Sequence, residues 1–156
     1  HEIRSVANNY TPTTDDLIPT GEVLSLETKM IDGTATHWDL SQLKAFGYLD
    51  PKRDGIDINL VLPSQVDLSI PAVKVTANNG LSLEVFTNQP GLQFYTGKNL
   101  LSVHPGFSGQ LYRPFEGFCV EPQKFPSSLT IPSFPSIICT PEQPYKQTTS
   151  IKISSN

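Results

Sequence analysis

Three polar side chains lie inside apolar, strand-like segments of this chain: Asp57, Gln93 and Glu121. Because successive side chains of a β-strand point to opposite faces, each of the three points away from its apolar neighbours. Together they offer one amide and two carboxylates. This mixture of hydrogen-bond donors and acceptors suits a polyol, whose hydroxyl groups both donate and accept. One hypothesis is therefore a sugar groove in which a carboxylate also transfers a proton.

A purely structural explanation exists for each of these residues. Strands of antiparallel sheets commonly present polar side chains to water, and strand alternation alone favours that explanation for any one residue taken singly. Other chemistry finds no support, because the chain contains no GxSxG, P-loop, HExxH or CxxC motif. We predict no metal site, because His1, His37 and His104 are far apart and none has a carboxylate or cysteine at ligand spacing.

The elements that would position these side chains are short strands. Prolines and glycines punctuate the sequence, and between them lie runs rich in Val, Ile, Leu, Phe, Tyr and Thr. Residues 58–62 and 81–87 alternate as half-buried strands do, and Ile151 and Ile153 alternate with polar neighbours near the C-terminus. The Asn-Asn-Gly sequence at 78–80 predicts a hairpin turn into the 81–87 strand. The pattern as a whole predicts an all-β, antiparallel fold.

Two segments depart from this pattern. Residues 37–47, HWDLSQLKAFG, have helix-like spacing, with Leu40, Leu43 and Phe46 on one stripe, and predict one or two helical turns. Residues 124–136 are rich in proline and predict an ordered or extended loop rather than a strand interior. No repeat or linker divides the chain, so we predict a single domain portion over residues 1–156.

Composition excludes several kinds of partner. The 15 acidic residues exceed the 11 Lys and Arg residues, giving a net charge of -4, and no basic stripe could follow nucleic-acid phosphates. No apolar run is long enough for a membrane helix and no targeting signal is visible, so we predict a soluble, cytoplasmic protein. Cys119 and Cys139 both lie in apolar, strand-like segments, where buried free thiols are expected rather than a disulfide.

Four blocks of sequence, taken in order, resemble the C-terminal half of the aldose 1-epimerases, or galactose mutarotases. These blocks are YTPTTDDLIPTGEV (10–23), GIDINLVL (55–62), LEVFTNQPGLQFYTG (83–97), and GFCVEPQKFPSS with the following FPS (117–128 and 134–136). The resemblance implies a β-supersandwich of two large antiparallel sheets with a sugar groove on one face. It also implies interconversion of the α and β anomers of free aldohexoses such as galactose and glucose, without a cofactor or metal.

The resemblance also assigns residues to roles. Glu121 matches the family's catalytic base, and Asp57 and Gln93 match residues that bind the sugar. The family's acid is a histidine in a motif that this chain lacks, and a second histidine and an arginine that touch the sugar also belong to the missing N-terminal half. His1 resembles a non-catalytic histidine at the start of a strand.

His37 and His104 lie outside the matched blocks, and we expect both in surface loops. Pro122 and Lys124 replace residues that are often threonine and histidine or similar in the family. Ile58-Asn59 replaces the asparagine-histidine pair that often follows the aspartate.

The chain is therefore predicted to be the C-terminal portion of one aldose 1-epimerase domain, incomplete and inactive by itself. We expect the N-terminal half, as a second chain or as a missing segment, to supply the acid and to cover apolar sheet faces and unpaired edges. Two alternatives stay open: a non-catalytic carbohydrate-binding relative, and an epimerase of hexose 6-phosphates. The second would need basic residues at the groove, for which Lys98, Arg113 and Lys124 are available.

Overall fold

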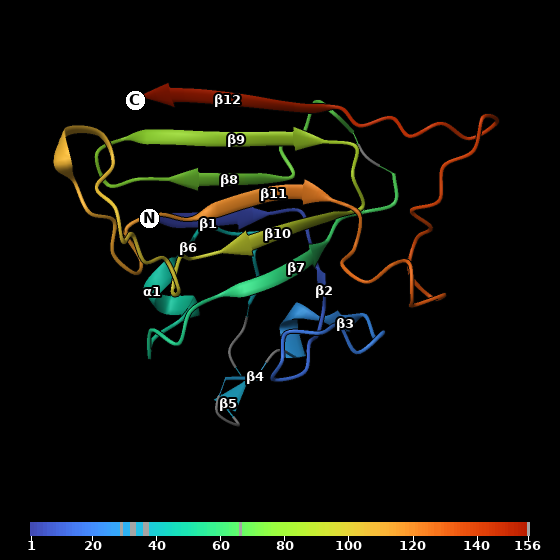
Figure 1. Cartoon of the computed structure of the whole chain (residues 1–156), viewed down its shortest axis with the longest axis horizontal. Coiled ribbons are helices and arrows are strands. Elements are labelled where there is room, and N and C mark those ends of the chain that lie inside the picture. The colour runs from blue at the N-terminus through green and yellow to red at the C-terminus, as the bar shows by residue number, and fades with distance from the viewer. Residues whose placement is uncertain (29, 32–33, 36–37, 66, 156) are drawn as a thin grey trace.

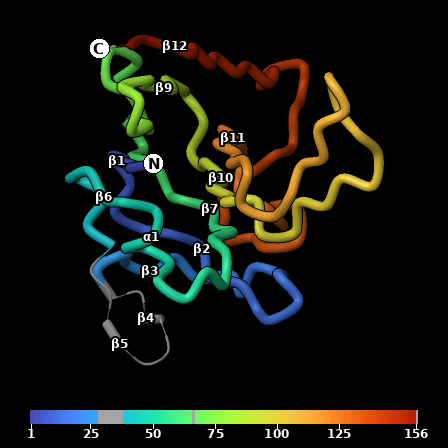
Figure 2. The backbone as a smooth tube through the Cα atoms, turned by 90° about the vertical axis from the view of Figure 1, so that its left-hand side faces the viewer, coloured from blue at the N-terminus to red at the C-terminus, as the bar shows by residue number. Residues whose placement is uncertain are grey.

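The chain folds into two antiparallel sheets packed face to face (Figures 1 and 2). The computed structural model describes residues 1–28, 30–31, 34–35, 38–65 and 67–155. In the first sheet the strand order is β12-β9-β8-β1-β6, and in the second it is β11-β10-β7-β2-β3. The predicted all-β class with antiparallel sheets is confirmed.

The strands are short, as the spacing of prolines and glycines predicts. The first sheet contains β1 (Glu2–Ser5), β6 (Lys44–Ala45), β8 (Val73–Thr76), β9 (Leu81–Thr87) and β12 (Thr149–Ser155). The second contains β2 (Asn9–Thr11), β3 (Leu24–Ser25), β7 (Asp57–Val61), β10 (Gly91–Tyr95) and β11 (Cys119–Gln123). A separate two-stranded sheet pairs β4 (Met30–Ile31) with β5 (Thr34–Ala35). The helical elements are α1 (Phe46–Leu49) and the 3-10 turns Leu26–Thr28 and Phe107–Gly109.

The hydrophobic core lies between the two sheets. Strand alternation sends Ile58 and Leu60 of β7 and Leu92 and Phe94 of β10 to the inner face of the second sheet, where all four are buried. The first sheet contributes Ile3, Val73, Val75 and Val85 from the opposite side. Since both inner faces are apolar, burying them against each other removes this surface from water, which stabilises the pair of sheets.

The predicted turn at residues 78–80 joins β8 to β9. Gly80 has a φ of 84°, a conformation that glycine adopts without the steric cost of a Cβ atom. The Ala77 amide donates to the Leu81 carbonyl at 2.8 Å, and Leu81 N donates to the Asn79 side chain at 3.1 Å. The two strands then pair antiparallel with Val75 opposite Leu83. This hairpin is confirmed.

The helix predicted within residues 37–47 is only partly correct. Lys44 and Ala45 form β6 beside β1, and the single helical turn α1 follows from Phe46 to Leu49. Leu40 is buried and Phe46 packs against the core, but Leu43 is 45% exposed, so the three side chains do not form one apolar stripe. Pairing of Lys44 and Ala45 with β1 therefore replaces the helix that the spacing of apolar residues predicts.

The proline-rich segment 124–136 is an ordered loop, as predicted. Its anchors are Phe125 and Phe134, both buried, whose rings meet edge to face with centroids 5.3 Å apart. The Ser133 hydroxyl donates to the Gly21 carbonyl at 3.2 Å, which ties the loop to the segment that follows β2.

Both cysteines are free. Cys119 begins β11 and is half-buried, but Cys139 lies in an exposed loop, so its predicted strand-like, buried setting is wrong. His104 lies in an exposed loop, as predicted, and His37 falls outside the described residues. In the part of the chain that the structure describes, no helix has the length and apolar character needed to cross a membrane.

Glu84 forms ion pairs with two lysines on the outer face of the first sheet. Its carboxylate lies 3.4 Å from Lys74 Nζ and 3.2 Å from Lys152 Nζ, on the two strands that flank β9. The hydrogen bond from Lys152, together with attraction to both lysines, holds the pKa of Glu84 below its usual value, although burial acts in the opposite direction.

Glu84→Gln should lower the free energy of unfolding at neutral pH by about 0.2–1 kcal/mol, the range for partly exposed ion pairs. Because the folded-state pKa of Glu84 lies below its unfolded-state value, this stabilisation is present above the unfolded-state pKa and is lost as pH falls through the folded-state pKa. Urea unfolding at about pH 7 and about pH 3 measures the difference. A double-mutant cycle with Lys152→Met is the control, and a coupling energy that persists unchanged in acid would contradict the assignment.

Candidate functional site

The three predicted site residues lie on one face of the second sheet, the side opposite the core. β10 is the central strand of the three: Gln93 pairs with Asn59 of β7 on one side and with Glu121 of β11 on the other. Tyr95 pairs with Asp57 and Cys119 in the adjacent row. We call this surface the polar face; it consists of Thr11, Asp57, Asn59, Gln93, Tyr95, Cys119, Glu121 and Gln123. Residues far apart in the sequence are thus brought together by strand pairing.

A hydrogen bond joins two of the predicted residues directly. Gln93 Nε2 donates to Asp57 Oδ1 at 2.6 Å across neighbouring strands. Gln123 Nε2 in turn approaches Gln93 Oε1 at 3.4 Å, a long contact that supports the same orientation of the Gln93 amide. Because its amide is held from one side by a carboxylate, Gln93 presents a fixed arrangement of donor and acceptor on the polar face.

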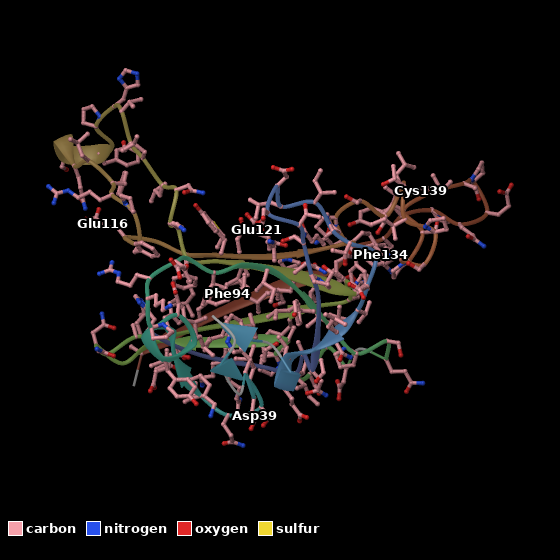
Figure 3. The ribbon with its side chains drawn as sticks, turned by 90° about the horizontal axis from the view of Figure 1, so that it is seen from below. Asp39, Phe94, Glu116, Glu121, Phe134 and Cys139 are labelled. Carbon is pink, nitrogen blue, oxygen red and sulfur yellow. The ribbon has the colours of Figure 1, made fainter. Side chains whose placement is uncertain are left out.

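Glu121 lies on β11, the last strand of the second sheet, with its side chain exposed. Figure 3 shows it on the opposite side of the sheet from Phe94, which points into the core. Pro122 follows it within the strand and is opposite Leu92. An exposed carboxylate beside Gln93 is accessible to a ligand bound on the polar face.

Thr11 and Asn59 are the buried members of the polar face. Asn59 is 3% exposed, and its Nδ2 donates to Thr11 Oγ1 at 3.1 Å. The burial of Asn59 requires glycine at position 91, because a Cβ atom there would lie 2.6 Å from Asn59 Oδ1 and 2.8 Å from the Phe125 ring. The lack of a side chain at Gly91 therefore lets both Asn59 and Phe125 pack against this position.

Strand alternation puts Asn59 on the same face as Asp57, but it does not predict that Asn59 is buried. Thr11 and Gln123 were missed as members of the polar face. Alternation within 119–123 would have placed Gln123 beside Glu121. Nothing local to the sequence indicates that Thr11 lies opposite Asn59, because that contact depends on the pairing of β2 with β7.

A shallow pocket of about 70 Å³ opens on the polar face. Its lining residues are Thr11, Thr13, Leu17, Pro19, Asp57, Asn59, Gln93 and Pro126. The loop after β2 and the proline-rich loop therefore form its walls, and β7 and β10 form its floor. No lysine or arginine is among these lining residues, so the pocket offers hydrogen-bonding groups and negative charge but no cation for a phosphate.

The ionisation of Cys119 is linked to both site carboxylates. Burial raises the pKa of the Cys119 thiol, and the negative charges of Glu121 and Asp57 raise it further. The thiol therefore stays protonated at neutral pH and is a poor nucleophile. The negative charges of Glu121 and Asp57 thus both reach the Cys119 thiol.

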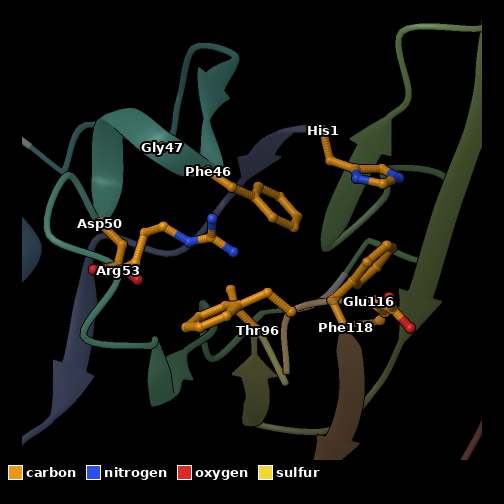
Figure 4. A pocket seen from close by; sticks show the side chains of 10 residues that line it. His1, Phe46, Gly47, Asp50, Arg53, Thr96, Glu116 and Phe118 are labelled. Carbon is orange, nitrogen blue, oxygen red and sulfur yellow. The ribbon is translucent and has the colours of Figure 1, made fainter. Parts of the chain in front are cut away.

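A larger cavity, of about 600 Å³, lies elsewhere (Figure 4). Its aromatic wall is on the core side of β11, where the ring centroids of His1 and Phe118 are 5.4 Å apart and those of Phe46 and Phe118 are 5.5 Å apart. Arg53 extends into this cavity, and its guanidinium carbon Cζ lies 4.8 Å from the centroid of the Phe115 ring. His1 thus lies away from the polar face, with the aromatic side chains of this second cavity. Among the described residues, no three His, Cys, Asp or Glu side chains are grouped so that they could hold a metal ion.

Comparison with known proteins identifies the family. The family model described as aldose 1-epimerase matches residues 1–152. The chain belongs to the aldose 1-epimerase family. Human galactose mutarotase is 36% identical over 156 residues, which cover 99% of this chain and 44% of the human protein. Aldose 1-epimerase of Escherichia coli K12 is 28% identical over 144 residues, which cover 89% of this chain and 40% of the bacterial protein.

Solved structures of aldose epimerase relatives share the fold. A GalM/aldose epimerase homologue from C. elegans superimposes with a TM-score of 0.76 at 19% identity, covering 99% of this chain and 45% of that one. Galactose 1-epimerase from Lactobacillus acidophilus NCFM gives a TM-score of 0.65 at 21% identity, covering 99% of this chain and 43% of that one. The chain therefore spans less than half the length of the relatives it matches.

Proposed function

We propose that this chain is the C-terminal portion of an aldose 1-epimerase domain that interconverts the α and β anomers of free aldohexoses such as galactose and glucose. The observation that carries the proposal is the convergence of Asp57, Gln93 and Glu121 on one polar face of a sheet, in a chain that belongs to this family. This arrangement combines a carboxylate that can accept a proton with two groups that can hold sugar hydroxyls.

Glu121 acts as the general base in this proposal. It takes the proton from the C1 hydroxyl while an acid protonates the ring oxygen, so the C1–O5 bond breaks and an open-chain aldehyde forms. Rotation of the carbonyl group and reversal of both proton transfers close the ring on the other face. General acid and base catalysis of this kind typically contributes about 10²–10⁴-fold. The exposed position of Glu121 supports this role, because the carboxylate must reach the substrate directly.

Asp57 and Gln93 bind the sugar. Asp57 accepts from sugar hydroxyl groups, and the Gln93 amide both donates and accepts. The 2.6 Å hydrogen bond between them fixes their relative orientation before the substrate arrives, which lowers the entropy cost of binding. The absence of lysine and arginine from the pocket lining favours an unphosphorylated sugar.

The acid comes from the N-terminal portion of the domain. His1 packs with Phe46 and Phe118 on the core side, and His104 lies in an exposed loop outside the polar face, so neither described histidine is placed to protonate a sugar held beside Glu121. A histidine in the family's N-terminal motif supplies this function in the proposal.

Exposed apolar surface supports the same conclusion. Ile151 and Ile153 of β12 are 62% and 67% exposed, and an apolar groove of about 230 Å³ runs from Ile153 past Leu83 to Phe118. β12 lies at one end of the first sheet. Unpaired sheet edges and apolar faces are normally covered in stable proteins. We assign this surface to the N-terminal portion of the same domain, as a preceding segment or as a second chain.

Polarimetry on fresh α-galactose and α-glucose tests the proposal. The complete domain should equilibrate the anomers far faster than the spontaneous reaction, and this chain alone should not. Sugar binding without accelerated equilibration would instead identify a non-catalytic carbohydrate-binding relative, and activity confined to hexose 6-phosphates would contradict the proposed substrate. Full activity of the isolated chain would refute the need for an N-terminal portion.

A further inference from the structure

The side chain of Gln147 holds the outer edge of β11 next to Glu121. Gln147 Nε2 donates to the Pro122 carbonyl at 3.2 Å and to Thr149 Oγ1, also at 3.2 Å. Pro122 belongs to the second sheet, whereas Thr149 begins β12 of the first. One amide group therefore links the two sheets immediately beyond the proposed base.

The position of Gln147 is itself fixed by neighbouring hydrogen bonds. Tyr145 Oη lies 2.6 Å from Gln147 Oε1 and 3.3 Å from Gln89 Oε1. Since the tyrosine hydroxyl has one proton and both partners are acceptors, the shorter bond to Gln147 is the one it donates. Asn88 fixes the backbone on both sides, because its Nδ2 donates to the Lys146 carbonyl at 3.3 Å and its Oδ1 accepts from Thr148 N at 2.9 Å.

The outer edge of β11, the strand that carries the proposed base, has no neighbouring strand among the described residues. Among the described strands, β11 has a partner on one side, β10, and lies at the end of its sheet. N–H and C=O groups of successive strand residues point to alternate sides, so the Pro122 carbonyl faces away from β10 while the amides of Glu121 and Gln123 face it. Gln147 thus takes the place of a neighbouring strand at Pro122, whose ring nitrogen has no N–H to donate.

We propose that Gln147 is a positioning residue for Glu121. By donating to the Pro122 carbonyl, the Gln147 amide limits fraying of the end of β11. The Glu121 carboxylate is thereby kept in a fixed position relative to Asp57 and Gln93. This inference rests on the proposed function for its catalytic consequence. Small displacements of a catalytic group reduce the rate of the chemical step more than they reduce binding, because Asp57 and Gln93 hold the sugar from other strands.

Gln147→Met in the complete domain keeps the length of the side chain and removes the donated hydrogen bonds. We expect kcat for anomer interconversion to fall about two- to tenfold, the factor that corresponds to one neutral hydrogen bond, with KM nearly unchanged. Hydrogen–deuterium exchange of the Glu121 and Gln123 amides should become faster. Tyr145→Phe, which only frees the Gln147 amide, should shift both readouts in the same direction by a smaller amount.

Gln143→Met is the matched control, because Gln143 lies in the same loop and its hydrogen bonds to Thr140 run through its backbone nitrogen and carbonyl. It should leave both readouts unchanged. Unchanged exchange at β11, or faster exchange with unchanged kcat, would overturn the inference, as would a rise in KM alone. An inactive wild-type domain would overturn the proposed function and the catalytic consequence together. If Gln147→Met fails to fold, the milder Tyr145→Phe variant decides between these outcomes.

Discussion

Replacing Glu121 with Gln in the complete domain should lower kcat for anomer interconversion by about 10²–10⁴-fold, the usual contribution of a general base. The amide has nearly the shape of the carboxylate but cannot accept the C1 proton at neutral pH. The fold should be unaffected, because the side chain is exposed on the polar face and contributes nothing to the core. Polarimetry on fresh α-galactose measures the rate, and thermal unfolding monitors the fold.

Glu116→Gln provides the matched control for this experiment. Glu116 precedes β11, accepts a hydrogen bond from the Arg113 amide at 2.9 Å and lines the cavity of Figure 4 rather than the polar face. The same chemical change at this position should leave the rate unchanged. An undiminished rate in Glu121→Gln would remove Glu121 from the role of base, and equal losses in the two variants would indicate a general effect of charge.

Phe94→Ala should reduce the free energy of unfolding by about 3–5 kcal/mol, the usual cost of deleting a buried phenylalanine ring. Phe94 is fully buried between the two sheets, and its ring meets Phe46 edge to face with centroids 5.1 Å apart. Truncation leaves a cavity that rigid neighbouring strands cannot fill. Such a loss is large against a total stability of about 5–15 kcal/mol. Denaturant unfolding of the complete domain measures it.

Phe107→Ala is the corresponding control, because Phe107 is 93% exposed in the 3-10 turn between β10 and β11. Its truncation should change the free energy of unfolding by less than about 0.5 kcal/mol. A comparable loss at both positions would show that the core between the sheets is not where the stability of this part of the domain resides.

Local patterns in the sequence predicted much of the secondary structure. Strand alternation identified β7 and β9, the Asn-Asn-Gly turn located the β8–β9 hairpin, and the prolines of 124–136 predicted an ordered loop. The helix within 37–47 was placed too early, because β6 pairs with β1 and leaves one helical turn. The setting of Cys139 was wrong, since apolar neighbours in sequence do not ensure burial.

The sequence by itself determined which side chains face together along each strand, because the period of two is a local property of extended backbone. Only the tertiary structure placed β10 between β7 and β11, which brings Gln93 beside Asp57 and into register with Glu121. Strand order depends on long-range pairing, which no local pattern encodes. The burial of Asn59 and the contact of Gln147 with Pro122 were likewise decided by packing between distant segments.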